Sequence, residues 1–187
     1  MTVPEKIVLL DGARTPVGSF GGAFKNVPAH ELGAAAARAG LDRAGVAGAD
    51  IDEVVMGCIG QVGPDAFNAR RVALAAGVPE SVPAYTVNRL CGSGLQAVWS
   101  AAMQMRWGGV DLALAGGNEN MSRMPFYDFD ARRGHRLGDR TLVDGTVAML
   151  TDPFHGVSRN RAPVVVSLAI SPSPSTATST SPSPAPE

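Results

Sequence analysis

Cysteine is scarce in this chain, and no long apolar run occurs near its N-terminus. Two cysteines, Cys58 and Cys91, among 187 residues do not make a disulfide framework, so we expect a reducing compartment. The N-terminal apolar run spans only Ile7–Leu10, which is too short for the core of a signal peptide or for a membrane span. We therefore expect a cytoplasmic protein that does not enter a membrane.

An excess of charge of either sign is also missing. The chain has 16 lysines and arginines against 17 aspartates and glutamates, which gives a formal net charge of −1. With 45% apolar and 18% charged residues, the composition is typical of a globular protein and unlike that of a disordered or nucleic-acid-binding chain. We expect no nucleic-acid partner, and the length suits one sizeable domain plus an appendage.

Metal-binding and dinucleotide-binding patterns are missing as well. The two cysteines lie far apart and the three histidines are scattered, so no zinc-ligand spacing occurs. Gly57, Gly60 and Gly63 do not match the G-x-G-x-x-G spacing of a dinucleotide-binding turn. We expect no metal and no permanently bound cofactor.

Strand-like and helix-like segments, by contrast, alternate up to Gly117. Apolar runs that end at turn residues predict strands, and alanine-rich stretches that end at glycine predict helices. The predicted strands cover 6–12, 51–60, 83–88 and 110–117, and the predicted helices cover 30–45, 66–77 and the residues after Cys91 up to 107. Because this alternation requires crossover connections, we predict an α/β fold with a mostly parallel sheet covered on both faces.

Two further segments follow this predicted domain of residues 1–117. Residues 118–157 are rich in charge, glycine and proline, and we expect loops with one short helix. Residues 158–187 lack glycine, have almost no acid and alternate serine with proline, which predicts a disordered tail with polyproline-II character. A run within it, Val-Val-Val-Ser-Leu-Ala-Ile, has strand character, but nothing in the sequence indicates what it would pair with.

Cys91 lies at the junction between a predicted strand and a predicted helix. Unpaired N–H groups and the positive dipole end at the first turn of a helix would stabilise a thiolate there. The residues that recur at helical spacing beyond it, and so predict the face that docks this helix, are Leu95, Val98, Ala102 and Met105. From its position alone, Cys91 is either a nucleophile or a small buried residue.

Four segments together resemble the thiolases, the acetyl-CoA C-acyltransferases. They are ARTPVGSFGGAF from Ala13, VNRLCGSGLQAV from Val87, AGGNENMSRMPF from Ala115 and LTDPFHG from Leu150, and they occur in the family's order. The family fold is a pair of similar α/β halves. The resemblance therefore implies a first half, a layered α/β domain with a mixed, largely parallel sheet, together with the opening of an inserted loop region.

The resemblance also implies acyl transfer between CoA thioesters, as in fatty acid metabolism, by condensation from acetyl-CoA or by thiolysis of a 3-ketoacyl-CoA. Cys91 would carry the acyl group as a thioester, and its backbone N–H would form part of an oxyanion hole. Leu150 falls where the family packs the pantetheine arm, although an ordinary apolar residue on a short helix fits the same pattern. The resemblance implies that acyl-CoA and acetyl-CoA are the small-molecule partners. It also implies that the chain forms a homo-oligomer or pairs with a full-length thiolase.

The chain departs from the family where the second half should begin. Thiolases take an activating histidine and a proton-transferring cysteine from Gly-His-Pro and Cys-x-Gly segments there. Here Gly134-His135 is followed by arginine where the family has proline. Cys58 is followed by Ile-Gly and so matches Cys-x-Gly, but it aligns with an early strand of the first half, and we expect it to be a core thiol. Losing the base removes help worth about 10² to 10⁴-fold, so we expect at most slow self-acylation of Cys91.

The segment after Val157 suggests a hypothesis about the gene. Where the family continues with His-Met-Gly, this chain has Ser158-Arg159-Asn160, and the composition changes at the same point. A frameshift or truncation would explain both observations. Sequencing the gene and finding no in-frame thiolase second half downstream would count against this hypothesis.

Two other functions remain open. A non-catalytic chain would bind CoA esters or pair with an intact thiolase subunit. An unrelated cysteine hydrolase would use Cys91 together with one of His30, His135 and His155, the chain's three histidines. For His30 and His155, however, we expect polar side chains that face solvent and have no catalytic role.

Overall fold

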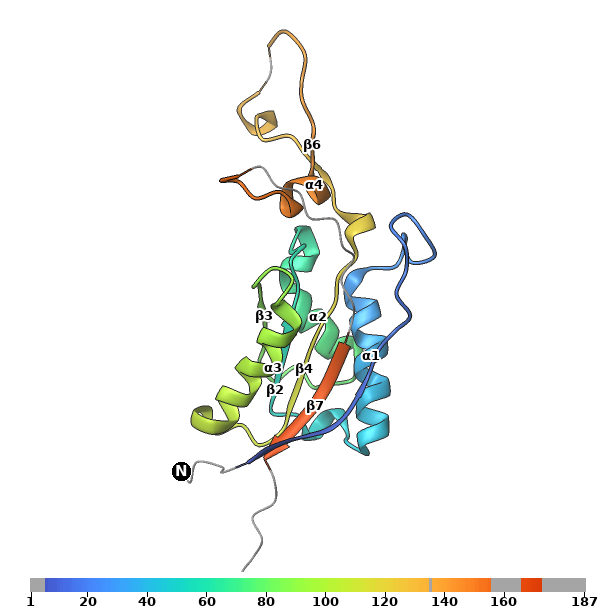
Figure 1. Ribbon diagram of the computed structural model, residues 1–187, viewed down its shortest axis with the longest axis vertical. Coiled ribbons are helices and arrows are strands. Elements are labelled where there is room, and N and C mark those ends of the chain that lie inside the picture. Colours follow the sequence, from blue (N-terminus) through green and yellow to red (C-terminus); the bar gives the residue numbers. More distant parts are fainter. Residues whose placement is uncertain (1–5, 135, 156–165, 173–187) are drawn as a thin grey trace, which may run out of the picture.

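The protein is described by a computed structural model that covers residues 6–134, 136–155 and 166–172, the last of these through its backbone (Figure 1). Predictions for His135 and for residues 156–165 and 173–187 lie outside the described residues. Among the helices that the structure describes, none is long and apolar enough to cross a membrane.

The main sheet has five strands. In spatial order they are β1 (Ile7–Ala13), β7 (Val166–Pro172), β4 (Ala113–Gly117), β2 (Glu53–Gly57) and β3 (Ala84–Val87). β2 lies between β4 and β3 and is parallel to both, with Val55 opposite Ala115 and Tyr85. β7 is antiparallel to β1 and to β4. The sheet is therefore mixed, and the predicted layered α/β fold is confirmed.

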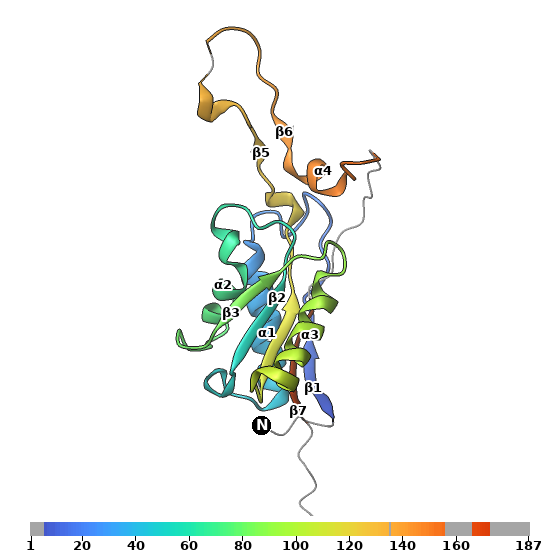
Figure 2. The same cartoon turned by 90° about the vertical axis from the view of Figure 1, so that its left-hand side faces the viewer.

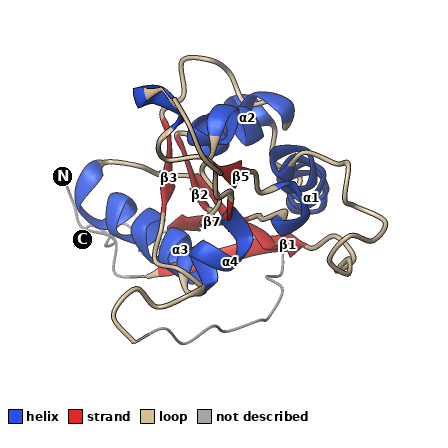
Figure 3. Ribbon diagram, turned by 90° about the horizontal axis from the view of Figure 1, so that it is seen from above, coloured by secondary structure: helices blue, strands red, loops and turns tan. Residues whose placement is uncertain are grey.

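Helices cover both faces of the sheet, as predicted. α1 (Ala29–Ala44) and α2 (Asn68–Ala75) lie on one face, whereas α3 (Ser93–Met103) and its continuation, the π-helical turn η3 (Gln104–Gly108), lie on the other (Figure 3). The short 3-10 turns η1 (Gly48–Asp50) and η2 (Gly63–Phe67) precede β2 and α2. The crossovers through α2 and α3 thus join parallel strands.

Helix α1 ends at the glycine that the sequence indicates. Gly45 adopts a φ of 66°, in the left-handed region, and the Val46 N–H donates to the carbonyl of Leu41 at 3.0 Å. Leu41 and Val46 pack in the same apolar cluster. The glycine therefore ends the helix and turns the chain back onto the core.

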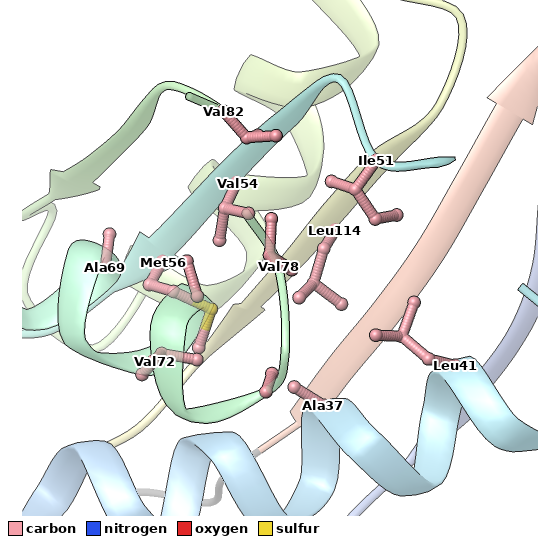
Figure 4. Close-up of a cluster of buried hydrophobic side chains, with 12 residues drawn as sticks. Ala37, Leu41, Ile51, Val54, Met56, Ala69, Val72, Val78, Val82 and Leu114 are labelled. Atoms are coloured by element: carbon pink, nitrogen blue, oxygen red, sulfur yellow. The ribbon is translucent and has the colours of Figure 1, made fainter. Parts of the chain in front are cut away.

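The apolar core lies in two layers, one on each face of the sheet. Beneath α1 and α2, aliphatic side chains of the helices meet Val54, Met56 and Leu114 of the strands (Figure 4). Beneath α3 the buried side chains are mostly small: Val55, Ala97, Ala101, Met105, Ala113 and Ala115. Small side chains let α3 approach the sheet closely, which fixes the position of the turn that precedes it.

The face on which α3 docks differs from the predicted one. Leu95, predicted to face the core, is 77% exposed, and of the predicted docking residues only Met105 is buried. The residues that α3 buries instead are Ser93, Ala97 and Ala101. The prediction was wrong for Leu95, whereas Met105 is buried and Val98 packs against the cluster beneath α3 as predicted. The error arose because α3 is apolar on several sides, and close packing on the sheet favours its small side chains.

Residues 118–155 form an excursion beyond the end of β4 (Figure 2). It contains the 3-10 turns η4 (Met121–Arg123) and η5 (Ala131–Arg133), the antiparallel pair β5 (Phe126–Tyr127) and β6 (Val143–Asp144), and α4 (Gly145–Leu150). The Asp144 carboxylate caps α4 by accepting the N–H groups of Thr146 and Val147 at 2.8 and 3.2 Å. The short helix was expected. The two strands were not predicted, because strands of two residues are too short to show a periodic pattern of apolar residues.

Strand β7 lies inside the segment for which we predicted disorder. Its Ile170 pairs with Leu9 of β1 on one side and with Ala113 of β4 on the other. The strand character of this apolar run was evident in the sequence, but its partners were not, because the nearer of them, β4, ends 49 positions before β7 begins. β7 is held in the sheet by main-chain pairing with two neighbours at once.

Candidate functional site

The polar residues of interest lie where parallel strands end. Cys58 follows β2, Cys91 follows β3 and Glu119 follows β4. Because β2, β3 and β4 are parallel, their carboxyl ends meet at one edge of the sheet, which is where open α/β sheets bind ligands. This edge is the candidate functional site, and the excursion of residues 118–155 starts from it (Figure 1).

Cys91 is exposed, which argues against the alternative of a small buried residue. It lies in a turn before the helix rather than in its first turn, because Gly92 is the N-cap of α3. The N–H groups of Gly92 and Ser93 donate to the carbonyls of Arg89 and Leu90, each at 3.0 Å, and so the turn delays the start of the helix.

This turn has a strained backbone. Leu90, directly before Cys91, has a φ of 48°, which is uncommon for a residue with a side chain of this size. Its N–H donates to Oδ1 of Asn88 at 3.0 Å. The left-handed residue turns the chain sharply between β3 and α3, and thereby leaves Cys91 at the surface.

Ser93 holds the same turn closed from inside. Its hydroxyl accepts the Arg89 N–H at 2.9 Å and donates to the Leu90 carbonyl at 2.6 Å, and the residue is 5% exposed. This role was not predicted from the sequence, although the serine stands two residues after the cysteine, at the start of a predicted helix. Ser93 is therefore a positioning residue for the cysteine turn.

Glycines bring the start of α3 against the sheet. A Cβ atom on Gly57 of β2 would lie 2.4 Å from the carbonyl carbon of Ser93, and one on Gly117 of β4 would lie 3.1 Å from Cα of Gly94. Any larger residue at Gly57 would push α3 away. The absence of side chains at these strand ends thus allows the cysteine turn to sit at the edge of the sheet.

Cys58 is buried, as expected of a core thiol. Its Sγ lies 3.7 Å from Oε1 of Glu119, whose carboxylate also accepts the N–H groups of Ile59 and Gly60 at 2.7 and 3.0 Å. Burial, reinforced by the charge of Glu119, raises the pKa of the Cys58 thiol far above its ordinary value. Cys58 is therefore a thiol and not a thiolate at neutral pH.

Glu119 joins the loops after β2 and β4, a role that was not predicted from the sequence. Burial raises the pKa of its carboxyl, while the hydrogen bonds from Ile59 and Gly60 oppose the shift. A Cβ on Gly60 would lie 2.7 Å from Oε1 of Glu119, so the glycine is needed for this contact. The one signal in the sequence was an acid between two asparagines at the end of a strand.

A cavity of about 470 Å³ opens beside this edge. It is formed by the loop after β1, the residues after β4 and helix α4, and its lining includes Pro16, Phe20, Phe24, Glu119 and Leu150. Its volume and mixed lining are typical of small-molecule sites. The structure thus brings Leu150 together with Glu119, whereas Cys91 does not line the cavity.

Neither of the two histidines that the structure describes is hydrogen-bonded to Cys91. His30 is partly buried, contrary to our expectation of a solvent-facing residue, and burial and nearby Arg71 lower the pKa of its ring. His155 is exposed, with Nδ1 2.7 Å from Oδ2 of Asp152. Among residues 6–134 and 136–155, no side chain is hydrogen-bonded to the Cys91 thiol, and no group of three acidic, histidine or cysteine residues could hold a metal ion.

Comparisons with known proteins agree with one another. The family model for the thiolase N-terminal domain matches residues 7–161. Beta-ketothiolase BktB of Cupriavidus necator is 47% identical over 154 residues, which are 82% of this chain and 39% of that protein. An acetyl-CoA acetyltransferase of Syntrophomonas wolfei is 44% identical over 157 residues, again 39% of that protein.

Among solved structures, the Bacillus anthracis acetyl-CoA acetyltransferase superposes with a TM-score of 0.79 at 39% identity, covering 83% of this chain and 40% of that one. The chain therefore spans about two fifths of the length of the relatives it matches.

Proposed function

Because this chain belongs to the thiolase family, we propose that it carries the acyl-accepting part of an acyltransferase that acts on CoA thioesters, with Cys91 as the nucleophile. The observation that supports this proposal is an exposed cysteine in a strained, internally hydrogen-bonded turn at the carboxyl edge of a parallel sheet. The rigid turn would present the sulfur to a substrate without rearrangement.

In the proposed reaction, the Cys91 thiolate attacks the carbonyl carbon of an acyl-CoA. The C–S bond to CoA breaks, CoA leaves as a thiol after taking up a proton, and the acyl group remains on Sγ. A base then removes a proton from the methyl group of an acetyl-CoA, and the resulting enolate attacks this acyl carbon. The acyl–Sγ bond breaks as the C–C bond forms, which releases a 3-ketoacyl-CoA and restores the thiolate. Thiolysis of a 3-ketoacyl-CoA is the same sequence in reverse, and the backbone N–H of Cys91 would help to bind the oxyanion.

The first half-reaction needs a base that removes the thiol proton. The described residues give Cys91 no hydrogen-bonded base, and the resemblance to the thiolases implies that the activating histidine belongs to the second half of the family fold. General-base help is worth about 10² to 10⁴-fold, so the isolated chain would self-acylate slowly and would turn over poorly. We place such a chain in fatty acid metabolism, with CoA thioesters as substrates and no resident cofactor.

Leu150 supports a place for the pantetheine arm. It lines the cavity, as do Phe20 and Val147, and such apolar side chains would pack against the methylene and methyl groups of the arm. The boundaries that we propose are an α/β domain of residues 1–117, a partial loop region of residues 118–157 and a tail of residues 158–187, for whose origin a frameshift or truncation is our hypothesis. Within that tail, Val166–Pro172 belongs to the sheet as β7.

A second candidate is a chain that binds CoA esters without catalysis. It is favoured by one observation, that the cavity lined by Leu150 does not include Cys91. Such a chain would bind acyl-CoA in the cavity and leave Cys91 unmodified.

Intact-mass spectrometry after incubation with acetyl-CoA tests the proposal. We expect one acetyl adduct on the wild-type chain and on Cys58→Ala, and none on Cys91→Ala. Folded wild-type protein that binds acetyl-CoA but gains no adduct would overturn the catalytic proposal in favour of the binding one.

A further inference from the structure

Glu119 places a carboxyl group in the wall of the cavity. It follows β4 at the carboxyl edge of the sheet and lines the cavity together with Leu150 of α4. Asp144 also lines the cavity, but its carboxylate caps α4 by accepting two backbone N–H groups. Glu53, another glutamate whose pKa burial raises, begins β2 at the opposite end of that strand and does not line the cavity. Among the described acids, Glu119 is therefore the one best placed for chemistry in the cavity.

The carboxylate of Glu119 can accept one more proton. An ionised carboxylate offers about four acceptor sites, two on each oxygen. Oε1 accepts the Gly60 N–H at 3.0 Å and lies 3.7 Å from Sγ of Cys58, whereas Oε2 accepts the Ile59 N–H at 2.7 Å. Within the part of the chain that the structure describes, no second group donates to Oε2. One acceptor site on Oε2 is therefore open.

The surroundings of this carboxyl make it a stronger base than an ordinary glutamate. Burial raises the pKa of Glu119, and the hydrogen bonds from Ile59 and Gly60 oppose this shift only in part. A general base is most effective when its pKa lies near the operating pH, and groups with perturbed pKa values in clefts are often catalytic. The same two N–H groups hold the carboxylate in one position, so it need not be ordered when a substrate binds.

Hydroxyl groups in the same cavity are available as donors. Thr15 and Ser122 both line it. The Thr15 hydroxyl has no hydrogen-bond partner among the described residues, and the Ser122 hydroxyl accepts the Gly21 N–H at 2.9 Å, which leaves its own hydrogen free to donate. An O–H group that points at a thioester carbonyl would stabilise negative charge on that oxygen. The cavity thus combines a base with donors for an oxyanion.

We propose that Glu119 is the base that removes a methyl proton from an acetyl-CoA bound in this cavity, with Oε2 as the accepting atom. The C–H bond breaks, its electron pair forms the carbon–carbon double bond of the enolate, and the thioester oxygen takes the negative charge. The hydroxyls of Thr15 and Ser122 donate to that oxygen. In D₂O the proton on Oε2 exchanges with solvent and a deuteron returns to the carbon, so the step needs no oxidant, reductant or cofactor.

This inference rests on the proposed function in one respect, the binding of acetyl-CoA in the cavity that Leu150 lines. It names a base for the second half-reaction. Thiolases take a proton-transferring cysteine from their second half, whereas Glu119 lies in a segment that resembles the first half. The exchange step does not involve Cys91, because a methyl proton can leave and return without any acyl transfer.

Proton NMR of acetyl-CoA in D₂O tests the proposal on the full chain. We expect the wild type to replace the methyl protons by deuterium faster than buffer alone does. Glu119→Gln should do so about 100-fold more slowly or less, since general-base help is worth about 10² to 10⁴-fold. The matched control is Glu31→Gln, which changes an exposed glutamate of α1 that does not line the cavity, and it should exchange at the wild-type rate.

The pH profile gives a readout that a loss of folding would not produce. Exchange requires the carboxylate form, so its rate should rise with pH through the folded pKa of Glu119, above the ordinary value of 4.5, and then level off.

A second variant keeps the test informative if Glu119→Gln does not fold. Val147 is 55% exposed and lines the cavity from α4, so Val147→Trp would fill the cavity while leaving the hydrogen bonds of Glu119 in place. Exchange by this variant should fall toward the rate in buffer alone. Wild-type exchange in folded Val147→Trp would place the reaction outside the cavity and overturn the proposal.

Three other results would overturn it as well. They are wild-type exchange no faster than in buffer although acetyl-CoA is bound, wild-type exchange in folded Glu119→Gln, and a rate that rises with pH without levelling off. Intact mass reports the Cys91 adduct on the same wild-type protein, so the two proposals fail separately. An adduct without exchange removes Glu119 as the base and leaves Cys91 as the nucleophile, and exchange without an adduct does the reverse. A folded chain that does not bind acetyl-CoA overturns both.

Discussion

The loops after β2 and β3 start at the same edge of the sheet and each carries a cysteine, yet the two thiols lie in opposite environments. Cys58 follows β2 directly, is 1% exposed and is hydrogen-bonded to a carboxylate. Cys91 lies four residues beyond β3, in a turn that leaves it exposed. A place at the end of a buried strand therefore does not make a reactive cysteine, and the conformation of the next few residues decides its exposure.

The largest expected effect is on the relative reactivity of the two thiols. Burial beside Glu119 shields the Cys58 sulfur from the reagent and raises the pKa of its thiol, so iodoacetamide should label Cys58 on the order of 100-fold more slowly than the exposed Cys91 in the native state. Peptide mapping after timed labelling measures both rates. In denaturant the two labelling rates should converge. If native Cys58 is labelled as fast as Cys91, the two thiols do not lie in opposite environments.

Next in size is the effect of filling the space at Gly57. In Gly57→Ala the new Cβ would lie 2.4 Å from the backbone of Ser93, so α3 must shift, and we expect a loss of about 1–3 kcal/mol in the free energy of unfolding. Gly94→Ala is the matched control, since its Cβ would have no neighbour nearer than 4.0 Å. Urea unfolding compares them, and equal stability of the two variants would contradict the close approach.

Removing the Ser93 hydroxyl should show how far the turn contributes to stability and to the reactivity of Cys91. Ser93→Ala leaves the Arg89 N–H without its acceptor, and we expect a loss of about 1 to 2 kcal/mol in stability. The rate at which iodoacetamide labels Cys91, and the dependence of that rate on pH, should also change. A substitution elsewhere that only lowers stability would leave both unchanged. Ser81→Ala, at an exposed serine with no side-chain hydrogen bond, should change neither quantity.

The smallest expected effect is a pH dependence that arises at Glu119. Because its folded pKa is raised above the ordinary value of 4.5, the native state binds its proton more readily than the unfolded state does. Its contribution to stability is therefore present below pH 4.5 and is lost as pH rises through the folded pKa. Urea unfolding at several pH values should show the wild type losing stability relative to Glu119→Gln across this window, and a constant difference would contradict the assignment.

Much of the fold was predictable, because its signals are local. Alternating apolar segments predicted the strands and helices up to Gly117, and Gly45 marked the end of α1. The pairing of β7 with β1 and β4 was not predictable, since no local feature of Val166–Pro172 indicates partners so far away in the sequence.

The site was predictable in part. Cys91 was predicted from its position between a strand and a helix, and Leu150 from the resemblance of its segment to the family. The structure leaves Cys91 exposed and places Leu150 in the cavity lining, while their catalytic and binding roles stay predictions. Glu119 and Ser93 were missed because their roles depend on contacts with backbone N–H groups that the fold brings together. The predicted docking face of α3 was partly wrong, because periodicity cannot distinguish two apolar faces of one helix when the smaller side chains pack inward.

The most direct test of the account is to locate the acetyl group after brief incubation of the folded chain with acetyl-CoA. Peptide mapping by mass spectrometry, with Cys58→Ala and Cys91→Ala analysed in parallel, reports each cysteine separately. The account predicts acetylation at Cys91 in the wild type and in Cys58→Ala, with Cys58 unmodified throughout. Acetylation of Cys58, or none at Cys91 in folded protein, would contradict it.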